Sequence, residues 1–177
     1  SDVYKRQGYA THDFDWIRRN IPSDLNAQLI DVTSSNAVLS LFGPKARDIL
    51  QMVTLNDVSD NGHPFGSARQ ISIAGCPVLA LRITYVGELG WELHLPVEYA
   101  QTIYNTLIEA GSPLGLRNAG YRAIETLRLE KGYRAWSSDI GPDHTPDEAG
   151  LGWAIKMKSN ISFKGRDAIA RQREEGI

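Results

Sequence analysis

The amino-acid sequence predicts an α+β fold: an antiparallel sheet with a split βαβ (ferredoxin-like) order and helices on one face. Three observations lead to this prediction. Apolar runs and strict alternation mark short strands, stripes at helical spacing mark helices, and these segments follow one another as strand, helix, strands and helix. This order is typical of a sheet that carries its helices on a single face.

The first part of the chain is expected to form a helix, a strand and a second helix. Phe14 and Ile17 are spaced as on one face of a short helix. Pro22 ends it, because the residue before a proline disfavours helical backbone. A continuous apolar run then predicts a buried strand, and Pro44 after it is well placed in the first turn of a helix. The expected ranges are about 13–20, 36–42 and 46–53.

The middle of the chain is expected to form strands joined by glycine turns. Leu79, Leu81 and Ile83 alternate with residues that point to the opposite side, as in a strand between two different environments. A glycine-bounded turn over 86–90 follows, and the apolar residues after it alternate again, so the two strands form a hairpin. The expected strands are a short one from Ile71 and the hairpin strands 77–85 and 91–95, with a loop over 62–66.

Two helices are expected next. An apolar stripe over 100–108 ends at Gly111, a residue type that is favourable just after a helix. A further helix over about 118–131 is expected to turn Ala123, Ile124 and Leu127 inward.

The last part of the chain carries a clear helix-start signal. Thr145 to Glu148 has the form of a capping box, with proline at the first helical position, and predicts a short helix. The other expected elements are a loop over 133–144, a strand over 152–157 and a charged helix within 163–177.

Composition narrows the range of partners. The chain has 177 residues with 42% hydrophobic and 23% charged, enough for one cored domain or a domain with part of a neighbour. A net charge of −2 provides no basic surface for nucleic acid, and no apolar run approaches the length of about 18 residues that a membrane span needs. We therefore expect neither nucleic acid nor membrane as a partner.

Cysteine usage indicates a reducing compartment. Cys76 is the single cysteine, so no internal disulfide can form, and no Cys and His cluster has the spacing of a metal site. We expect a cytoplasmic protein, or one of the mitochondrial matrix in a eukaryote, without bound metal. No nucleotide-binding fingerprint is present either, so these residues are not expected to hold a flavin or nicotinamide themselves.

The segment around Glu88 is the first candidate for chemistry. Its glycines, Gly87 among them, allow a sharp turn and the close approach of a flat ligand beside Tyr85. A carboxylate held there can accept two parallel hydrogen bonds from a ring N–H and an exocyclic amine. We expect Glu88 to lie in a dry aromatic niche. The competing interpretation is a turn glutamate in water.

Two large rings after the helix over 118–131 form the second candidate. Tyr133 and Trp136 lie on the expected loop, where a stacking wall for a heteroaromatic ligand competes with ordinary packing. Glu125 is spaced to pair with Arg128 or Arg122 as a solvated ion pair on the helix surface.

Four segments in order resemble the folate-binding aminomethyltransferase superfamily, whose type member is the glycine-cleavage T-protein. The segments are TYVGELGWELHLP (84–96), AGYRAIETLRLEKGYRAW (119–136), TPDEAGLGWAIK (145–156) and FKGRDAI (163–169). The EKGYRAW wording and Ile124 are more similar to the C-terminal folate-binding region of sarcosine and dimethylglycine dehydrogenases. The resemblance implies a chain that is a fragment of such an enzyme.

The resemblance also implies a function. Such a region passes a methylene unit from an iminium, formed from an N-methylamine, to tetrahydrofolate, while FAD is bound in a missing upstream domain. The partners would be a small-molecule folate, the N-methylamine substrate and an electron acceptor of the full-length enzyme. By this resemblance Glu88 holds the pterin ring, and the lining residues are Tyr85, Gly87, Tyr133 and Trp136. No catalytic residue is assigned, because the family's aspartate base precedes the matched region.

The resemblance leaves two further functions open and implies a domain division. One is a T-protein-like aminomethyltransferase, and the other is a non-catalytic regulatory module on the same scaffold. Residues 1–8 are expected to be a non-native or scar segment, 9–160 a partial folate-binding domain, and 161–177 the start of a connection to a missing C-terminal β-rich domain. Alone, this fragment is expected to bind folate weakly and to be inactive.

Overall fold

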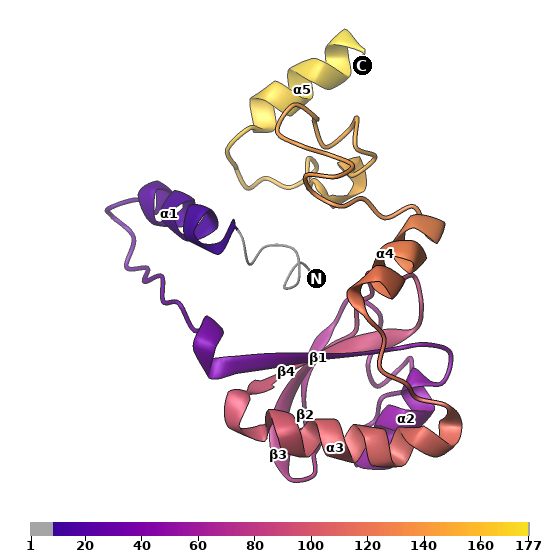
Figure 1. The fold of residues 1–177 in the computed structure, drawn as a ribbon. Helices are drawn as coiled ribbons and strands as arrows, with labels where there is room; N and C mark the ends of the chain where they lie inside the picture. The colour runs from indigo at the N-terminus through magenta and orange to yellow at the C-terminus, as the bar shows by residue number, and fades with distance from the viewer. Residues whose placement is uncertain (1–8, 177) are drawn as a thin grey trace. The chain divides into compact units, whose positions relative to one another are not determined.

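A computed structural model describes residues 9–176 of the chain (Figure 1). The predicted scar segment over 1–8 lies outside the described residues. The chain divides into two compact units between Tyr133 and Arg134. This division falls inside the range 9–160 expected for one partial domain, and those domain bounds stay a prediction.

The first unit is built on a four-stranded sheet in which all neighbouring strands are antiparallel, with the order β1-β4-β3-β2. Strands β1 and β3 therefore run the same way on either side of β4. The α+β class and the antiparallel sheet predicted from the sequence are confirmed. The elements are α1 (Ala10–Asn20), β1 (Asn36–Phe42), α2 (Ala46–Val53), β2 (Ala68–Ile73), β3 (Cys76–Leu81), β4 (Gly90–Pro96), α3 (Ala100–Gly111) and α4 (Tyr121–Glu130).

A two-residue turn joins β2 to β3. Ile73 pairs with Cys76, and both residues between them, Ala74 and Gly75, have left-handed backbone with φ of 51° and 78°. This is the backbone that matches the twist of a tight hairpin. The turn thereby sets the register of the pair.

The core lies between one face of the sheet and two helices. Strand residues at alternate positions face it, Trp91, Leu93 and Leu95 of β4 among them. Helices α2 and α3 lie side by side against this face (Figure 1), and Ile49 and Ile103 are buried between helix and sheet. Burying apolar area of this kind is the main driving force of folding.

Strand β3 is shorter than predicted. It ends at Leu81 rather than Tyr85, because the backbone of Arg82 bonds to a loop instead of to a strand. The Arg82 amide donates to the Ser67 carbonyl over 2.9 Å, and the Gly66 amide donates to the Arg82 carbonyl over 2.8 Å. The segment that follows is free to leave the sheet and form the turn before β4.

Helix α3 ends at Gly111 as predicted, but Gly111 is its last helical residue and not the residue just after the helix. Gly111 has φ of −89° and remains helical, and a Cβ there would lie 2.6 Å from a Leu116 side-chain atom. A short 3-10 helix continues to Leu114, and Gly115, with φ of 88°, provides the left-handed residue. Gly111 is thus a packing glycine.

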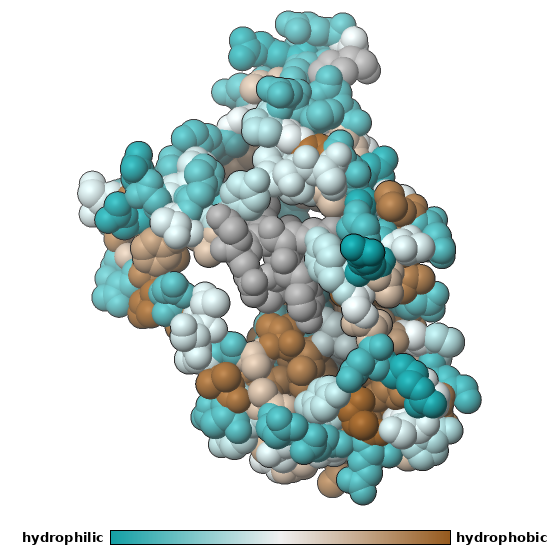
Figure 2. Space-filling model, viewed as in Figure 1, coloured by the Kyte–Doolittle hydropathy of each residue, from teal (hydrophilic) through white to brown (hydrophobic). Residues whose placement is uncertain are grey.

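The second unit, 134–177, has a 3-10 helix Gly152–Ala154 and helix α5 (Arg166–Glu175), and in the view of Figure 2 the surface of α5 is hydrophilic. The strand predicted over 152–157 is wrong. The capping box forms, with the Thr145 amide donating to the Glu148 carboxylate and the Glu148 amide to the Thr145 hydroxyl. It closes a turn over 146–150 and does not start a helix, so that helix prediction is also wrong. Arg173 of α5 holds Asp147 through two hydrogen bonds of 2.8 Å.

Candidate functional site

The turn between β3 and β4 brings most of the predicted site residues together. The Val86 amide donates to the Thr84 hydroxyl over 3.2 Å, and the Val86 side chain is buried, which anchors the turn from inside. Gly87 follows with φ of 77°, a backbone conformation that L side chains rarely adopt. The glycine was predicted for a sharp turn, and this is its geometry.

Tyr85 and Tyr133 are in direct contact. Their rings stack with centroids 6.1 Å apart and planes at 18°, and both side chains are half-buried. Stacking of this kind contributes about 0.5–1.5 kcal/mol beyond the burial of area. The pair therefore joins the turn to the end of helix α4.

Arg128 fixes the backbone of Tyr133. Its guanidinium is 1% exposed, pairs with the Glu125 carboxylate and donates to the Tyr133 carbonyl over 2.8 Å. The Tyr133 amide donates back to the Arg128 carbonyl over 2.9 Å. The predicted pairing of Glu125 with Arg128 occurs, but its description as a solvated surface pair is wrong, because the arginine is buried at the helix end.

The inward face predicted for α4 also needs correction. Arg128 is the buried side chain of this helix, Ile124 and Leu127 are half-buried, and Ala123 is exposed. Helical spacing of apolar residues could not identify Arg128, because its burial depends on the carbonyl of Tyr133 beyond the helix.

Gly87 lies against Lys131. A Cβ at position 87 would come within 2.8 Å of the Lys131 Cγ and 2.9 Å of its Cβ. Only a glycine permits this close approach. The lysine side chain thus lies against the turn at Gly87.

Gly87, Lys131 and Tyr133 border a cavity of about 340 Å³, here called the turn cavity. This volume falls within the range of about 300–1,000 Å³ typical of small-molecule sites. Its lining combines aromatic rings, a carboxylate and two cations. The lining residues include Phe65, Arg82, Gly87, Glu88, Lys131 and Tyr133.

Glu88 is exposed, so the dry aromatic niche expected for it is not what the structure shows. Its side chain borders the turn cavity and also a second cavity of about 460 Å³, here called the strand cavity. The strand cavity is lined mainly by apolar side chains, including Val38, Phe42, Leu116 and Ile124. Glu88 therefore lies between two cavities of different character, and its contact with a pterin stays a prediction.

Trp136 belongs to the second compact unit, where its ring is 42% exposed and its backbone bridges to Ile140. Its predicted part in the same pocket stays a prediction. Within the first unit, Gly87, Glu88 and Tyr133 line the turn cavity and Tyr85 stacks on Tyr133. Their common part in one ligand site stays a prediction.

The lining residues of the turn cavity that were not predicted from the sequence include an aromatic residue, Phe65, and two cations, Arg82 and Lys131. One local signal existed for the first of them. Phe65 stands between Pro64 and Gly66, where a loop would ordinarily carry a polar residue. Arg82 and Lys131 had no such local signal. The place of Arg82 depends on its backbone pairing with a distant loop, and that of Lys131 on its close approach to Gly87.

Two other kinds of feature are absent from the described part of the chain. Within residues 9–176 no three His, Cys, Asp or Glu side chains gather as a metal site would require. None of the helices over the same range has both the length and the apolar character needed to cross a membrane.

The sequence and structure are similar to known proteins. Residues 3–159 match the family model described as the GCVT N-terminal domain. Mitochondrial sarcosine dehydrogenase of Mus musculus is 41% identical over 177 residues, covering 98% of this chain and 19% of that protein. An aminomethyltransferase of Symbiobacterium thermophilum is 38% identical over 172 residues, covering 96% of this chain and 46% of that protein.

A solved structure shares the architecture. The glycine cleavage system aminomethyltransferase T from Bartonella henselae superposes with a TM-score of 0.77 at 27% identity. The match covers 96% of this chain and 44% of that chain. The chain thus spans less than half the length of each of these relatives.

Proposed function

Because the chain belongs to the GCVT N-terminal domain family, we propose that it is the folate-binding, one-carbon-transfer part of a flavin-dependent N-methylamine dehydrogenase of the sarcosine or dimethylglycine type. Membership confirms the superfamily predicted from the four sequence segments. Identity of 41% to a sarcosine dehydrogenase over nearly the whole chain supports the dehydrogenase over an aminomethyltransferase or a regulatory module.

The observation that carries the proposal is the turn cavity. It combines a carboxylate, Glu88, with the ring of Tyr133 and with backbone that lies close at Gly87. A pterin has a planar face and an edge with adjacent N–H and amine donors. An aromatic wall suits the face, and a carboxylate suits the edge through two charge-assisted hydrogen bonds. The residues present therefore fit the group.

Tetrahydrofolate would supply the nucleophilic nitrogen that accepts the one-carbon unit. The residues of this chain would bind and orient the pterin, since holding two reactants in register can supply a large part of a rate enhancement. No proton acceptor is assigned among them. FAD would be bound elsewhere in the full-length enzyme. A eukaryotic enzyme would work in mitochondria, since the mouse relative is named as mitochondrial.

A second function is supported by a specific observation. An aminomethyltransferase is 38% identical, and another shares the fold at a TM-score of 0.77. Such an enzyme would use the same cavity without a flavin domain. The complete reading frame separates the two functions, because the dehydrogenase needs a dinucleotide-binding unit before this region.

Both functions require folate binding. Calorimetric titration of the 177-residue chain with 5-formyltetrahydrofolate tests this binding. Glu88→Gln should weaken binding about tenfold or more, because a hydrogen bond to a charged group contributes about 1.5–3 kcal/mol. Glu109→Gln on α3 is the matched control, an exposed glutamate outside both cavities. No binding by the unaltered chain at millimolar ligand, or equal affinity in both variants, contradicts the proposal.

In the full-length enzyme, the same Glu88→Gln change should lower folate affinity and leave amine oxidation unchanged. Equal loss of both activities would contradict the separation of the folate site from the oxidation site.

A further inference from the structure

Phe65 is an exposed aromatic residue at the turn cavity. Its side chain is 70% exposed, yet it lines the same cavity as Glu88 and Tyr133. It comes from the loop between α2 and β2, whereas Glu88 and Tyr133 come from two later segments. The ring therefore adds a third segment to the wall of the site.

Backbone hydrogen bonds fix the loop that carries Phe65. Gly66 donates to the Arg82 carbonyl, and Arg82 donates to the Ser67 carbonyl, over 2.8 and 2.9 Å. The Ser67 hydroxyl donates to the Pro64 carbonyl over 2.6 Å. Residues on both sides of Phe65 are thus hydrogen-bonded. Their partner Arg82 lies just after β3, at the start of the segment that leads into the Tyr85–Glu88 turn.

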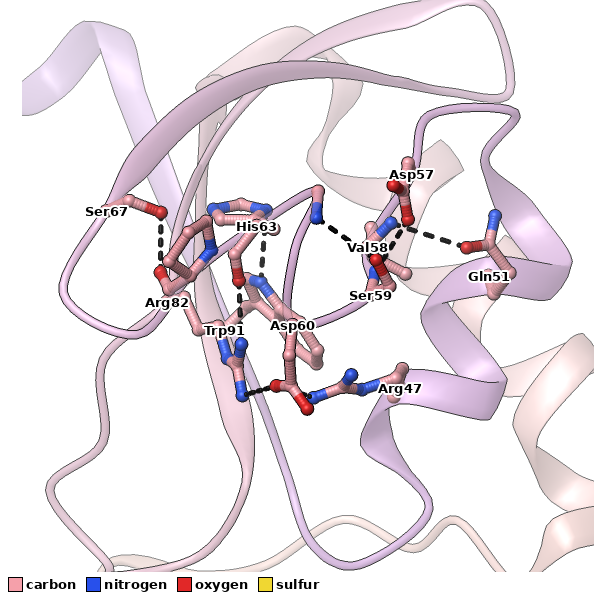
Figure 3. Close-up of polar contacts among 12 residues, drawn as sticks. Arg47, Gln51, Asp57, Val58, Ser59, Asp60, His63, Ser67, Arg82 and Trp91 are labelled. Carbon is pink, nitrogen blue, oxygen red and sulfur yellow. Dashed lines mark hydrogen bonds and ion pairs between the residues drawn. The ribbon is translucent and has the colours of Figure 1, made fainter.

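The Arg82 side chain ties the same loop a second time. Its guanidinium donates to the His63 carbonyl over 2.7 Å and pairs with the Asp60 carboxylate over 2.6 Å (Figure 3). Arg47 of α2 contacts the same carboxylate oxygen over 2.7 Å. Arg82 is 9% exposed, so this pairing is shielded from solvent on the arginine side. The loop, helix α2 and the end of β3 thus meet at the Asp60 carboxylate, which two guanidinium groups contact.

His63 anchors the loop in the core. Its imidazole is fully buried, and the Trp91 indole N–H donates to its Nδ1 over 3.3 Å (Figure 3). Phe65 follows two residues later and is the part of this tied segment that remains exposed. A ring held on a rigid frame loses little conformational freedom when a ligand stacks on it.

We propose that Phe65 is a ligand-binding residue that stacks on the planar part of the pterin in the turn cavity, and that Arg82 is the positioning residue that holds it there. This inference rests on the proposed folate function. Glu88 borders both cavities, and both contain aromatic residues. The turn cavity is favoured because the turn that carries Glu88, with Gly87 in it, forms part of its wall, so a flat ligand can approach the backbone there. The strand cavity takes only Val86 and Glu88 from this turn, and its other lining residues are mainly aliphatic, with Phe42, Tyr104 and Tyr121.

Fluorine NMR distinguishes the two cavities. The chain has four phenylalanines, Phe14, Phe42, Phe65 and Phe163, so incorporation of 4-fluorophenylalanine labels few positions, which single Phe→Leu variants assign. On addition of 5-formyltetrahydrofolate the signal of Phe65 should shift most. A dominant shift of Phe42, which lines the strand cavity, would overturn the inference.

Affinity measurements give a second test. Phe65→Ala should weaken binding of 5-formyltetrahydrofolate about two- to tenfold, and Phe65→Tyr should keep it, because the stacking face is retained. Leu55→Ala is the matched control, since Leu55 is fully exposed and lies outside both cavities. Unchanged affinity in Phe65→Ala overturns the inference.

The positioning role of Arg82 needs a readout beyond stability. Arg82→Met should reduce the ligand-induced shift of the Phe65 fluorine signal at saturating ligand, and Arg82→Lys should restore part of it. A saturated shift that is unchanged in Arg82→Met would overturn the positioning role. Where Arg82→Met does not fold, Asp60→Asn, which removes the partner of the same guanidinium, gives the same comparison.

The failure of this inference is distinguishable from failure of the proposed function. Weak binding by Glu88→Gln with normal binding by Phe65→Ala contradicts the inference and leaves the folate function in place. An unaltered chain that binds no reduced folate contradicts both.

Discussion

Tyr85 and Tyr133 stack with their ring centroids 6.1 Å apart and their planes at 18°. One ring belongs to the turn between β3 and β4, and the other to the first residues after α4. Since Arg128 also fixes the Tyr133 carbonyl, the turn and the helix end form one assembly beside the turn cavity. A ligand contact made by the turn therefore depends on the position of the helix end, and the reverse also holds.

The two tyrosines should be energetically coupled. In a double-mutant cycle of Tyr85→Leu and Tyr133→Leu, the free energy of unfolding from urea titrations should show a coupling of about 0.5–1.5 kcal/mol. Coupling arises because each ring is the other's stacking partner. Additive effects within about 0.3 kcal/mol would show that the rings do not support one another.

Gly87→Ala should destabilise the chain more than a comparable glycine substitution. Left-handed backbone costs an L residue about 1–2 kcal/mol, and Gly115, with φ of 88°, would incur this cost alone because nothing lies within 4 Å of its Cβ position. Gly87→Ala adds the contact with Lys131. Urea unfolding of both variants measures the difference.

Lys131→Ala in the Gly87→Ala background should recover part of that difference. The substitution removes the Lys131 Cγ and Cδ near the new methyl group but leaves its Cβ at 2.9 Å. Equal destabilisation by Gly87→Ala and Gly115→Ala, or no recovery on Lys131→Ala, would contradict the close approach of Gly87 to the lysine side chain.

Local patterns predicted the sheet well. The apolar run over 36–42 forms β1 with these bounds, and alternation at Trp91 and Leu93 marks a real core face, because strand periodicity depends on nearest neighbours along the chain. The end of β3 could not be predicted in this way. Its cause is the pairing of Arg82 with the distant Ser67, which no local period reveals.

The candidate site shows the same limit. Tyr85, Gly87 and Glu88 were predicted as site residues because turn glycines next to a carboxylate and rings are visible in one segment. Phe65 was missed because its place in the turn cavity comes from long-range ties of its loop. Arg128 was expected in solvent, since helical spacing to Glu125 says nothing of a carbonyl beyond the helix.

Asp60 should make the stability of the chain depend on acid pH. Hydrogen bonds from Arg47 and Arg82 lower the pKa of this carboxyl from 3.8 to about 2. A carboxyl with a lowered pKa stabilises the fold above its unfolded value and loses that contribution as the pH falls toward its folded value. The difference in free energy of unfolding between the unaltered chain and Asp60→Asn should therefore be constant above the ordinary pKa of 3.8 and shrink between 3.8 and about 2.

Glu109→Gln, an exposed glutamate on α3, is the control for removing one carboxylate in these titrations. A difference for Asp60→Asn that is the same throughout the acid range would show that the two arginines do not hold the carboxylate in solution.

His63 should add a second pH dependence nearer neutrality. Burial lowers the pKa of its imidazole below the ordinary value of 6.5, because the charged form would lose its hydration. As the pH falls below 6.5, the unfolded chain takes up a proton at this position that the folded chain does not bind, so the free energy of unfolding decreases.

His63→Asn keeps an acceptor for the Trp91 N–H and has no imidazole to titrate, so its stability should fall less between about pH 7.5 and 5. Urea unfolding across this range compares the two slopes, with His12→Gln, at an exposed position, as the control for losing one histidine. Equal slopes for the unaltered chain and His63→Asn would mean that His63 accepts its proton in the folded state. A neutral imidazole would then not be the acceptor that links Trp91 to the loop that carries Phe65.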